Sequence, residues 1–149
     1  MGSDTKSLAQ VELELAVLAR TLEGLSRRSQ IHRELDRASY LLARTLSGDG
    51  QTSIKGLAAA LGLDATTVTR QVATMEAARL VTRTVDPSDG RVSLIELSPL
   101  GRRKMEAVRS ARERRMDELL DDWPESDRRE FGRLLQRLNE ALFEDHRQQ

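Results

Sequence analysis

The sequence predicts a mainly α-helical chain with one small β-hairpin, an α+β arrangement, and three observations lead to this prediction. Apolar residues recur every three or four positions over most of the 149 residues, which is the period of helices with one buried face. A stretch at residues 80–97 instead carries β-branched residues around a cluster of turn formers. Helix-capping residues stand at Ser53, Asp64 and Ser98, where three helices are expected to begin.

Two short helices separated by a tight turn are predicted in the middle of the chain. The first follows Ser53, and its apolar positions share one face: Ile54, Leu57, Ala58 and Leu61. Gly62 ends this helix, because glycine adopts a positive φ at little steric cost. Asp64 caps the next helix, whose buried stripe is formed by Val68, Val72 and Met75.

The opposite face of this second helix carries Thr66, Arg70 and Ala73, flanked by Thr67 and Thr69. Arginine suits guanine edges or phosphate, and threonine suits phosphate or the thymine methyl group. The plainer interpretation is a solvated helix face that happens to be rich in threonine. Threonine is a mediocre helix former, so its repeated use here favours a DNA-reading face.

A hairpin is predicted after these helices. The strands are LVTRTV and RVSLIEL, and the loop between them is DPSDG. Arg83 lies on the first strand and Arg91 follows the loop, where an exposed arginine can enter an A·T-rich minor groove. Asp89 can hold Arg91 in one orientation. The alternative is an ordinary surface loop with a weak ion pair.

Helix, turn, helix, hairpin and a further helix begun by Ser98 and Pro99 are the elements of a winged helix-turn-helix, a module that reads DNA. Residues on its expected DNA-facing surface form the candidate binding set. They are Ser53, Lys55, Thr66, Thr67, Thr69, Arg70, Gln71, Arg83, Asp89 and Arg91.

Four segments resemble the MarR (multiple antibiotic resistance regulator) family of bacterial transcription factors, and the likeness runs from about residue 8 to residue 143. The segments are LDRASYLL, LAAALGLDATTVTRQVATMEAARLVTR, DPSDGR and LSPLGR. The family's wing motif Asp-x-Arg is present as Asp89-Gly90-Arg91, and the Ser or Thr then Arg of its recognition helix as Thr67-Val68-Thr69-Arg70. The chain differs in carrying Ser98 where the family usually has Thr, and Arg79 where glycine is common.

The resemblance implies a single MarR-like protomer over residues 1–149, with dimerisation helices at 7–46 and 98–146 and a DNA-binding lobe at 50–97. An apolar seam on the first helix and another after Pro124 agree with a homodimer, although a monomeric bundle would also bury them. The residues of the first seam are Leu8, Val11, Leu15, Leu18, Leu22 and Leu25. A twofold dimer implies a pseudo-palindromic operator on double-stranded DNA, with half-sites about 10 bp apart.

Composition excludes several classes of protein. The chain has no run of apolar residues long enough for a membrane span and no secretory signal, so the cytoplasm is the expected compartment. Net charge is zero, but residues 54–104 hold three more basic than acidic residues, which places positive charge in the reading module. With no cysteine, thiol redox sensing is excluded.

The family resemblance further implies a repressor that a small organic ligand relieves, with a pocket near the first two helices. Candidate ligand-binding residues are His32, Arg33, Tyr40 and Arg44, which suit a small aromatic or phenolic compound or an aromatic carboxylate. For Tyr40, packing in the core is the competing interpretation. The two histidines, His32 and His146, are too far apart in sequence for a dedicated zinc site to be expected, so no metal or cofactor is predicted.

Two rival functions can be compared with this one. An enzyme is not expected, because the sequence has no cysteine nucleophile, no His-rich metal site and no glycine-rich phosphate loop. A winged helix used for protein–protein contact is the alternative that stays open. It would favour an aromatic or large apolar anchor on the face that here carries Thr66, Thr69 and Arg70.

Overall fold

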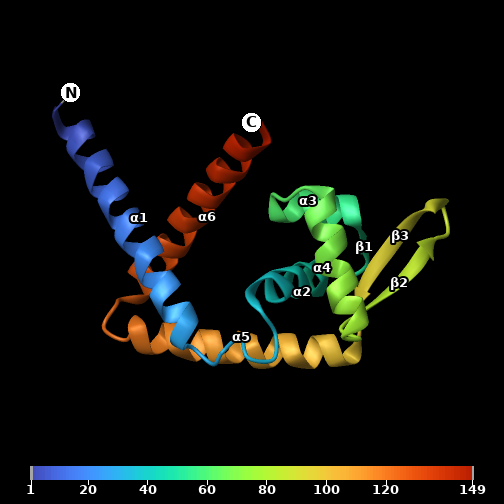
Figure 1. Ribbon diagram of the computed structural model, residues 1–149. Coiled ribbons are helices and arrows are strands. Elements are labelled where there is room, and N and C mark those ends of the chain that lie inside the picture. Colours follow the sequence, from blue (N-terminus) through green and yellow to red (C-terminus); the bar gives the residue numbers. More distant parts are fainter. Residues whose placement is uncertain (1, 149) are drawn as a thin grey trace. The chain divides into compact units, whose positions relative to one another are not determined.

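The computed structural model describes residues 2–148, apart from the side chains of residues 2–4 and 26–28. The chain forms two compact units, residues 1–32 and residues 33–149. The first unit contains helix α1 (Gly2–Arg28). The elements of the second, labelled in Figure 1, are α2 (Arg37–Asp49), β1 (Thr52–Ser53), α3 (Ile54–Leu61), α4 (Ala65–Ala77), β2 (Val81–Asp86), β3 (Asp89–Leu97), α5 (Pro99–Leu119) and α6 (Glu125–Gln148). The expected α+β fold class is confirmed.

Helix α1 leaves its predicted apolar seam on the surface of this single chain. Leu8 is 67% exposed, and the least exposed seam residue, Leu15, is still 38% exposed. A contiguous apolar stripe of this kind is unusual on a monomeric protein.

The core of the second unit lies where α2 packs against α3, α4, β3 and α5. Its largest fully buried side chains come from every one of these elements: Leu42, Leu46, Leu57, Val68, Val72, Met75, Ile95 and Met105. The stripe predicted for α4 is therefore the face that the helix buries. Helix α2 falls within the range expected for dimerisation, yet it packs inside the same unit as α3 and α4.

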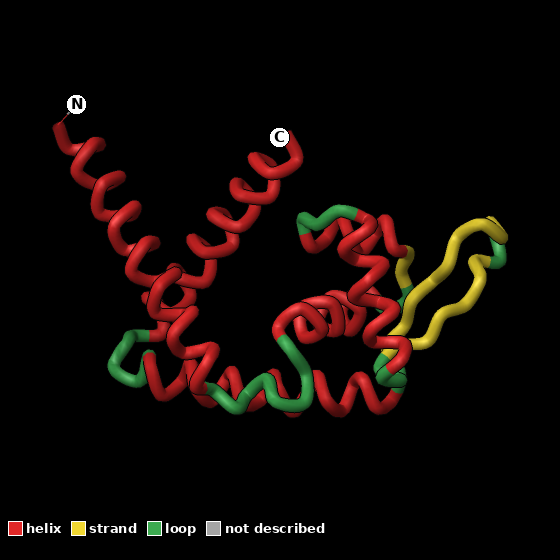
Figure 2. The backbone as a smooth tube through the Cα atoms, viewed as in Figure 1, coloured by secondary structure: helices red, strands yellow, loops and turns green. Residues whose placement is uncertain are grey.

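A three-stranded antiparallel sheet with strand order β1-β3-β2 borders this core. Strand β1 was not predicted, because its two residues are too few to show an alternating pattern. The predicted five-residue loop is wrong: β2 and β3 extend into it and leave only Pro87 and Ser88 as the turn (Figure 2). Asp86 Oδ1 accepts a hydrogen bond from the Ser88 backbone N–H at 2.8 Å, which stabilises that turn.

The end of α4, the start of β2 and the start of α5 are joined at Ser98. Its hydroxyl accepts a hydrogen bond from the Gly101 backbone N–H at 3.0 Å and donates one to the Arg79 carbonyl at 2.7 Å. Its backbone N–H donates to the Leu80 carbonyl at 3.0 Å. Gly101 is buried, and a Cβ there would collide with that same Leu80 carbonyl oxygen. The predicted cap is confirmed, and it also connects two helices through the strand between them.

Helix α4 ends in a Schellman motif, with Arg79 at the left-handed position. The backbone N–H of Leu80 donates to the Met75 carbonyl, and that of Arg79 donates to the Glu76 carbonyl. Arg79 has a φ of 61° and is the only non-glycine residue of the described chain with a positive φ. The turn keeps the shape that glycine usually provides, and arginine adopts it at a steric cost.

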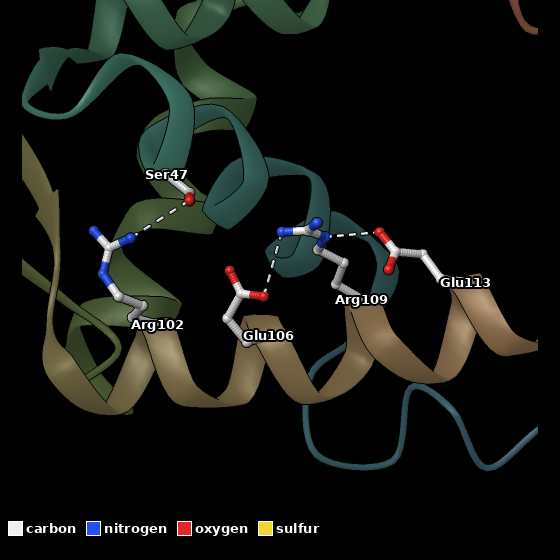
Figure 3. Close-up of polar contacts among 5 residues, drawn as sticks. All are labelled: Ser47, Arg102, Glu106, Arg109 and Glu113. Atoms are coloured by element: carbon white, nitrogen blue, oxygen red, sulfur yellow. Dashed lines mark hydrogen bonds and ion pairs between the residues drawn. The ribbon is translucent and has the colours of Figure 1, made fainter.

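Polar side chains on one side of α5 face α2, as Figure 3 shows. Arg102 Nη1 lies 3.5 Å from Ser47 Oγ. Further along α5, Arg109 binds Glu113 at 2.8 Å and Glu106 at 3.4 Å. These pairs are partly exposed, so their contribution to stability is small, and the apolar contacts beneath them hold the two helices together.

Helix α6 begins after a turn that contains Trp123 and Pro124. The rings of Trp123 and Phe131 pack at a centroid distance of 5.5 Å, which agrees with Trp123 as a packing residue at the helix break. Near the other end of α6, the ring of Phe143 lies against Gly62, the left-handed residue that ends α3 at a φ of 64°. A Cβ on Gly62 would be 2.6 Å from Phe143 Cδ1, so α6 contacts the turn between α3 and α4.

Replacing Gly101 with alanine should lower the free energy of unfolding by about 1–3 kcal/mol, because the new methyl group displaces the Leu80 carbonyl. Chemical denaturation followed by circular dichroism measures the change. Gly48→Ala is the matched control, since that helical glycine has open space around its Cβ position. The control should be neutral or stabilising by up to about 1 kcal/mol. Equal effects at the two positions would contradict the close contact at Gly101.

Replacing Arg79 with glycine should raise the free energy of unfolding by about 1 kcal/mol, because glycine adopts the left-handed conformation without steric cost. Arg79→Ala is the control, since it removes the same charge but keeps the Cβ. The two variants are compared in the same denaturation experiment. If alanine stabilises the protein as much as glycine does, the gain comes from the lost charge and the backbone interpretation is wrong.

Candidate nucleic-acid interface

The outward face of α4 carries the side chains expected to read DNA. Thr66, Thr69, Arg70 and Ala73 are all exposed, whereas Val68 on the opposite side is fully buried. None of the four is a large apolar residue. The face therefore offers one long cation and small side chains that allow a close approach to the edges of base pairs.

The threonines of α4 use their hydroxyl hydrogens within the helix. Thr69 Oγ1 donates to the Ala65 carbonyl at 2.7 Å, and Thr74 Oγ1 donates to the Arg70 carbonyl at 3.1 Å. This bonding satisfies a polar group on a residue that is a poor helix former. It leaves the methyl group and the oxygen lone pairs of Thr69 as its outward chemistry, which suits contact with a thymine methyl better than donation to a phosphate.

Thr67 has a different task, at the beginning of the helix. It is half-buried, and its backbone N–H and hydroxyl both donate to the carboxylate of Asp64, at 2.8 and 2.7 Å. These two hydrogen bonds lower the pKa of Asp64 below its ordinary value of 3.8, because they favour the ionised carboxylate. Thr67, predicted as a DNA contact, thus has its donors engaged in the cap.

Gln71 is also less available than the sequence indicated. The residue is half-buried, and within the described chain its amide oxygen Oε1 is covered and has no hydrogen-bond partner. In this conformation that oxygen does not reach a base edge. Its role in DNA binding stays a prediction.

The wing presents Arg91 at its surface. The side chain is 93% exposed, and its Nε lies 3.4 Å from Asp89 Oδ1, the atom that also accepts a hydrogen bond from the Arg91 backbone N–H at 3.1 Å. The pair expected from the wing motif is therefore present. A second contact braces the wing: Gln51 Nε2, just before β1, donates to Thr84 Oγ1 on β2 at 3.0 Å.

An open hollow of about 330 Å³ lies between the beginning of α3 and the wing. Three cationic side chains line it, Lys55 from α3, Arg83 from β2 and Arg91 from β3. The other lining residues are Ser53, Ile54, Val92 and Ser93. Ser53 caps α3, accepting a hydrogen bond from the Gly56 backbone N–H at 3.0 Å. Three cations around one concave surface suit an anion such as a phosphodiester group.

One member of this arrangement was missed by the sequence analysis. Glu76, in the last turn of α4, places its Oε2 3.4 Å from Nε of Arg83. The seven-residue separation spans a helix end, a left-handed turn and the start of a strand. No periodicity rule for a single helix or strand connects these two positions.

The four candidate ligand-binding residues are not equally placed. Tyr40 is only 8% exposed, and the guanidinium of Arg112 on α5 lies 5.2 Å from the centre of its ring. This favours packing in the core, the competing interpretation, with a cation–π contact on one face. Arg33 and Arg44 are exposed, and His32 is half-buried at the end of the first unit. A ligand site formed by these residues stays a prediction.

The fold and this surface define the class of the protein. Helices α3 and α4 with the hairpin β2–β3 form a winged helix-turn-helix, in which α4 is the recognition helix and its exposed face lies on the same lobe as a cationic wing. The second unit therefore has the architecture of a DNA-binding module.

Comparison with known proteins identifies the family. A model of the MarR family matches residues 33–92. The HTH-type transcriptional regulator YxaD of Bacillus subtilis (strain 168) is 38% identical over 134 residues, which cover 90% of this chain and 94% of YxaD. This chain belongs to the MarR family, whose members are DNA-binding transcriptional regulators and not enzymes.

Solved structures show the same fold. A MarR family protein from Bacillus stearothermophilus, 24% identical, superposes with a TM-score of 0.73 and matches 92% of this chain and 96% of its own. The PcaV transcriptional regulator of Streptomyces coelicolor, solved with its natural ligand, is 22% identical with a TM-score of 0.68, covering 84% of this chain and 91% of PcaV. Within residues 2–148, no helix combines the length and apolar character needed to cross a lipid bilayer.

Proposed function

We propose that this protein is a repressor that binds double-stranded DNA as a homodimer, at an inverted-repeat operator with half-sites about one helical turn apart. The observation that carries the proposal is the pairing of two surfaces in one lobe. The exposed face of α4 offers Arg70 and Thr69 to the major groove, and the hollow beside the wing holds three cations around a concave surface. Specificity comes from the first surface and affinity from the second.

The apolar surfaces of α1 and α6 support the homodimer. Leu8, Val11 and Leu18 on α1 are at least 41% exposed, and Leu134 and Leu142 on α6 are 46% and 56% exposed. The free energy gained by removing such surface from water favours burial against another apolar surface. In this proposal a second copy of the chain provides that surface.

Relief of repression by a small organic ligand is part of the proposal. PcaV, whose fold this chain shares, was solved with its natural ligand, and a ligand site in this chain would involve helices α1 and α2. A ligand that prefers a dimer with differently placed recognition helices weakens DNA binding in proportion to its differential affinity for the two states. Titration of DNA-bound protein with phenolic and aromatic carboxylate compounds tests this part. If none of them changes operator affinity, there is no support for relief by this class of ligand.

Selection of bound sequences from random duplex DNA tests the function itself. The purified full-length protein is used at a fixed, stated salt concentration, because phosphate contacts make affinity steeply salt-dependent. Enrichment of an inverted repeat is the expected result. A lack of any enriched sequence, at salt low enough for non-specific binding, would overturn the proposal and favour a winged helix that contacts protein.

Arg70→Ala should weaken binding to the selected operator by about 1–3 kcal/mol and relax specificity at one position in each half-site, if Arg70 reads a base. Repeating the selection with the variant measures both effects. Ala73→Ser on the same exposed face is a control that leaves the guanidinium in place. Equal weakening on operator and random DNA would instead assign Arg70 to a phosphate.

Arg91→Ala should weaken binding most on operators with A·T-rich flanks, because a narrow minor groove concentrates negative potential around an inserted arginine. Affinities for operators that differ only in their flanks measure this preference. Asp89→Asn, which keeps a hydrogen-bond acceptor beside Arg91, should have a smaller effect. Unchanged affinity for every flank after Arg91→Ala would remove the wing tip from the DNA contact.

A further inference from the structure

Glu76 is a carboxylate within an otherwise cationic part of the DNA-binding lobe. It lies on the recognition helix α4, and its side chain is 44% exposed. Arg83, which it contacts, lines the hollow together with Lys55 and Arg91. A negative charge beside a surface that binds a polyanion lowers affinity by repulsion, unless it does something that offsets this effect.

The geometry of the pair indicates what offsets the repulsion. Arg83 stands opposite Ile95 in the sheet, and the Ile95 side chain is fully buried. The Arg83 side chain is 32% exposed, and its Nε faces Glu76 Oε2 at 3.4 Å. An arginine has five N–H donors in a rigid planar fork, so engagement of Nε orients the guanidinium and leaves the terminal nitrogens available for another anion.

We propose that Glu76 is a positioning residue for DNA binding: it orients the guanidinium of Arg83 so that its terminal nitrogens bind a phosphodiester oxygen at the hollow beside the wing. The inference rests on the proposed DNA-binding function. It also gives the pair a second consequence. Glu76 belongs to the recognition helix and Arg83 to the wing, so the ion pair sets the wing's phosphate contact relative to the helix that reads the bases.

The variant Glu76→Gln separates positioning from simple repulsion, because the two predict opposite signs. If Glu76 orients Arg83, its loss should lower affinity for the selected operator on the order of fivefold, even though a negative charge has been removed. The slope of log affinity against log salt should also fall by about 0.9, the value for one lost phosphate contact. If Glu76 only repels DNA, affinity should rise and the slope should not fall, which would overturn the proposal.

Two further variants sharpen the test. Glu76→Asp keeps the charge but shortens the side chain, so it should lose affinity as Glu76→Gln does; wild-type affinity would contradict positioning. Glu96→Gln, an exposed carboxylate on β3, controls for the loss of one negative charge from the same lobe and should leave affinity equal or slightly higher.

A double-mutant cycle with Arg83→Ala completes the experiment. Adding Glu76→Gln to Arg83→Ala should cause no further loss of affinity, because the positioned group is already gone. Additive losses would show that Glu76 acts independently of Arg83 and would overturn the proposal. Failure of the proposed function is distinguished beforehand, since the wild-type protein would then bind no operator. Thermal unfolding of each variant verifies that the fold is intact.

Discussion

The carbonyl group of Leu80 lies against Gly101 where the recognition helix, the wing and α5 meet. Ser98 closes this junction from the other side, with hydrogen bonds to the backbone of Arg79, Leu80 and Gly101. Because the end of α4, the first residue before the wing and the start of α5 are held by the same few atoms, none of these elements can rotate alone. The angle between the recognition helix and the wing, on which contact with two grooves depends, follows from this packing.

Electrostatics in the lobe is local and not a property of the whole chain. Net charge is zero, yet Lys55, Arg83 and Arg91 gather at one hollow. Carboxylates near these cations take part in contacts: Glu76 with Arg83, and Asp89 with Arg91. Long-range attraction to DNA is therefore weak, and the oriented short-range contacts make the larger difference between one sequence and another.

The sequence was sufficient for the helices, their caps and the buried stripe of α4, because each depends on residues within a few positions of one another. It was insufficient where distant segments meet. Strand β1 exists only through pairing with β3, and the wing turn is shorter than its turn-forming residues indicated. At the candidate interface, exposure of Thr66 and Arg70 followed from helical spacing. The inward donation by the Thr69 hydroxyl and the contact of Glu76 with Arg83 depend on rotamers and tertiary packing.

The contact between Phe143 and Gly62 has a consequence for how this sequence can drift. Position 62 excludes other residues on two independent grounds, a left-handed backbone and an aromatic ring where a Cβ would stand. A change there becomes acceptable only if position 143 changes as well, so the two sites are expected to evolve as a pair although they lie far apart along the chain. The turn inside the DNA-binding motif thereby shares its evolutionary history with the last helix of the protein.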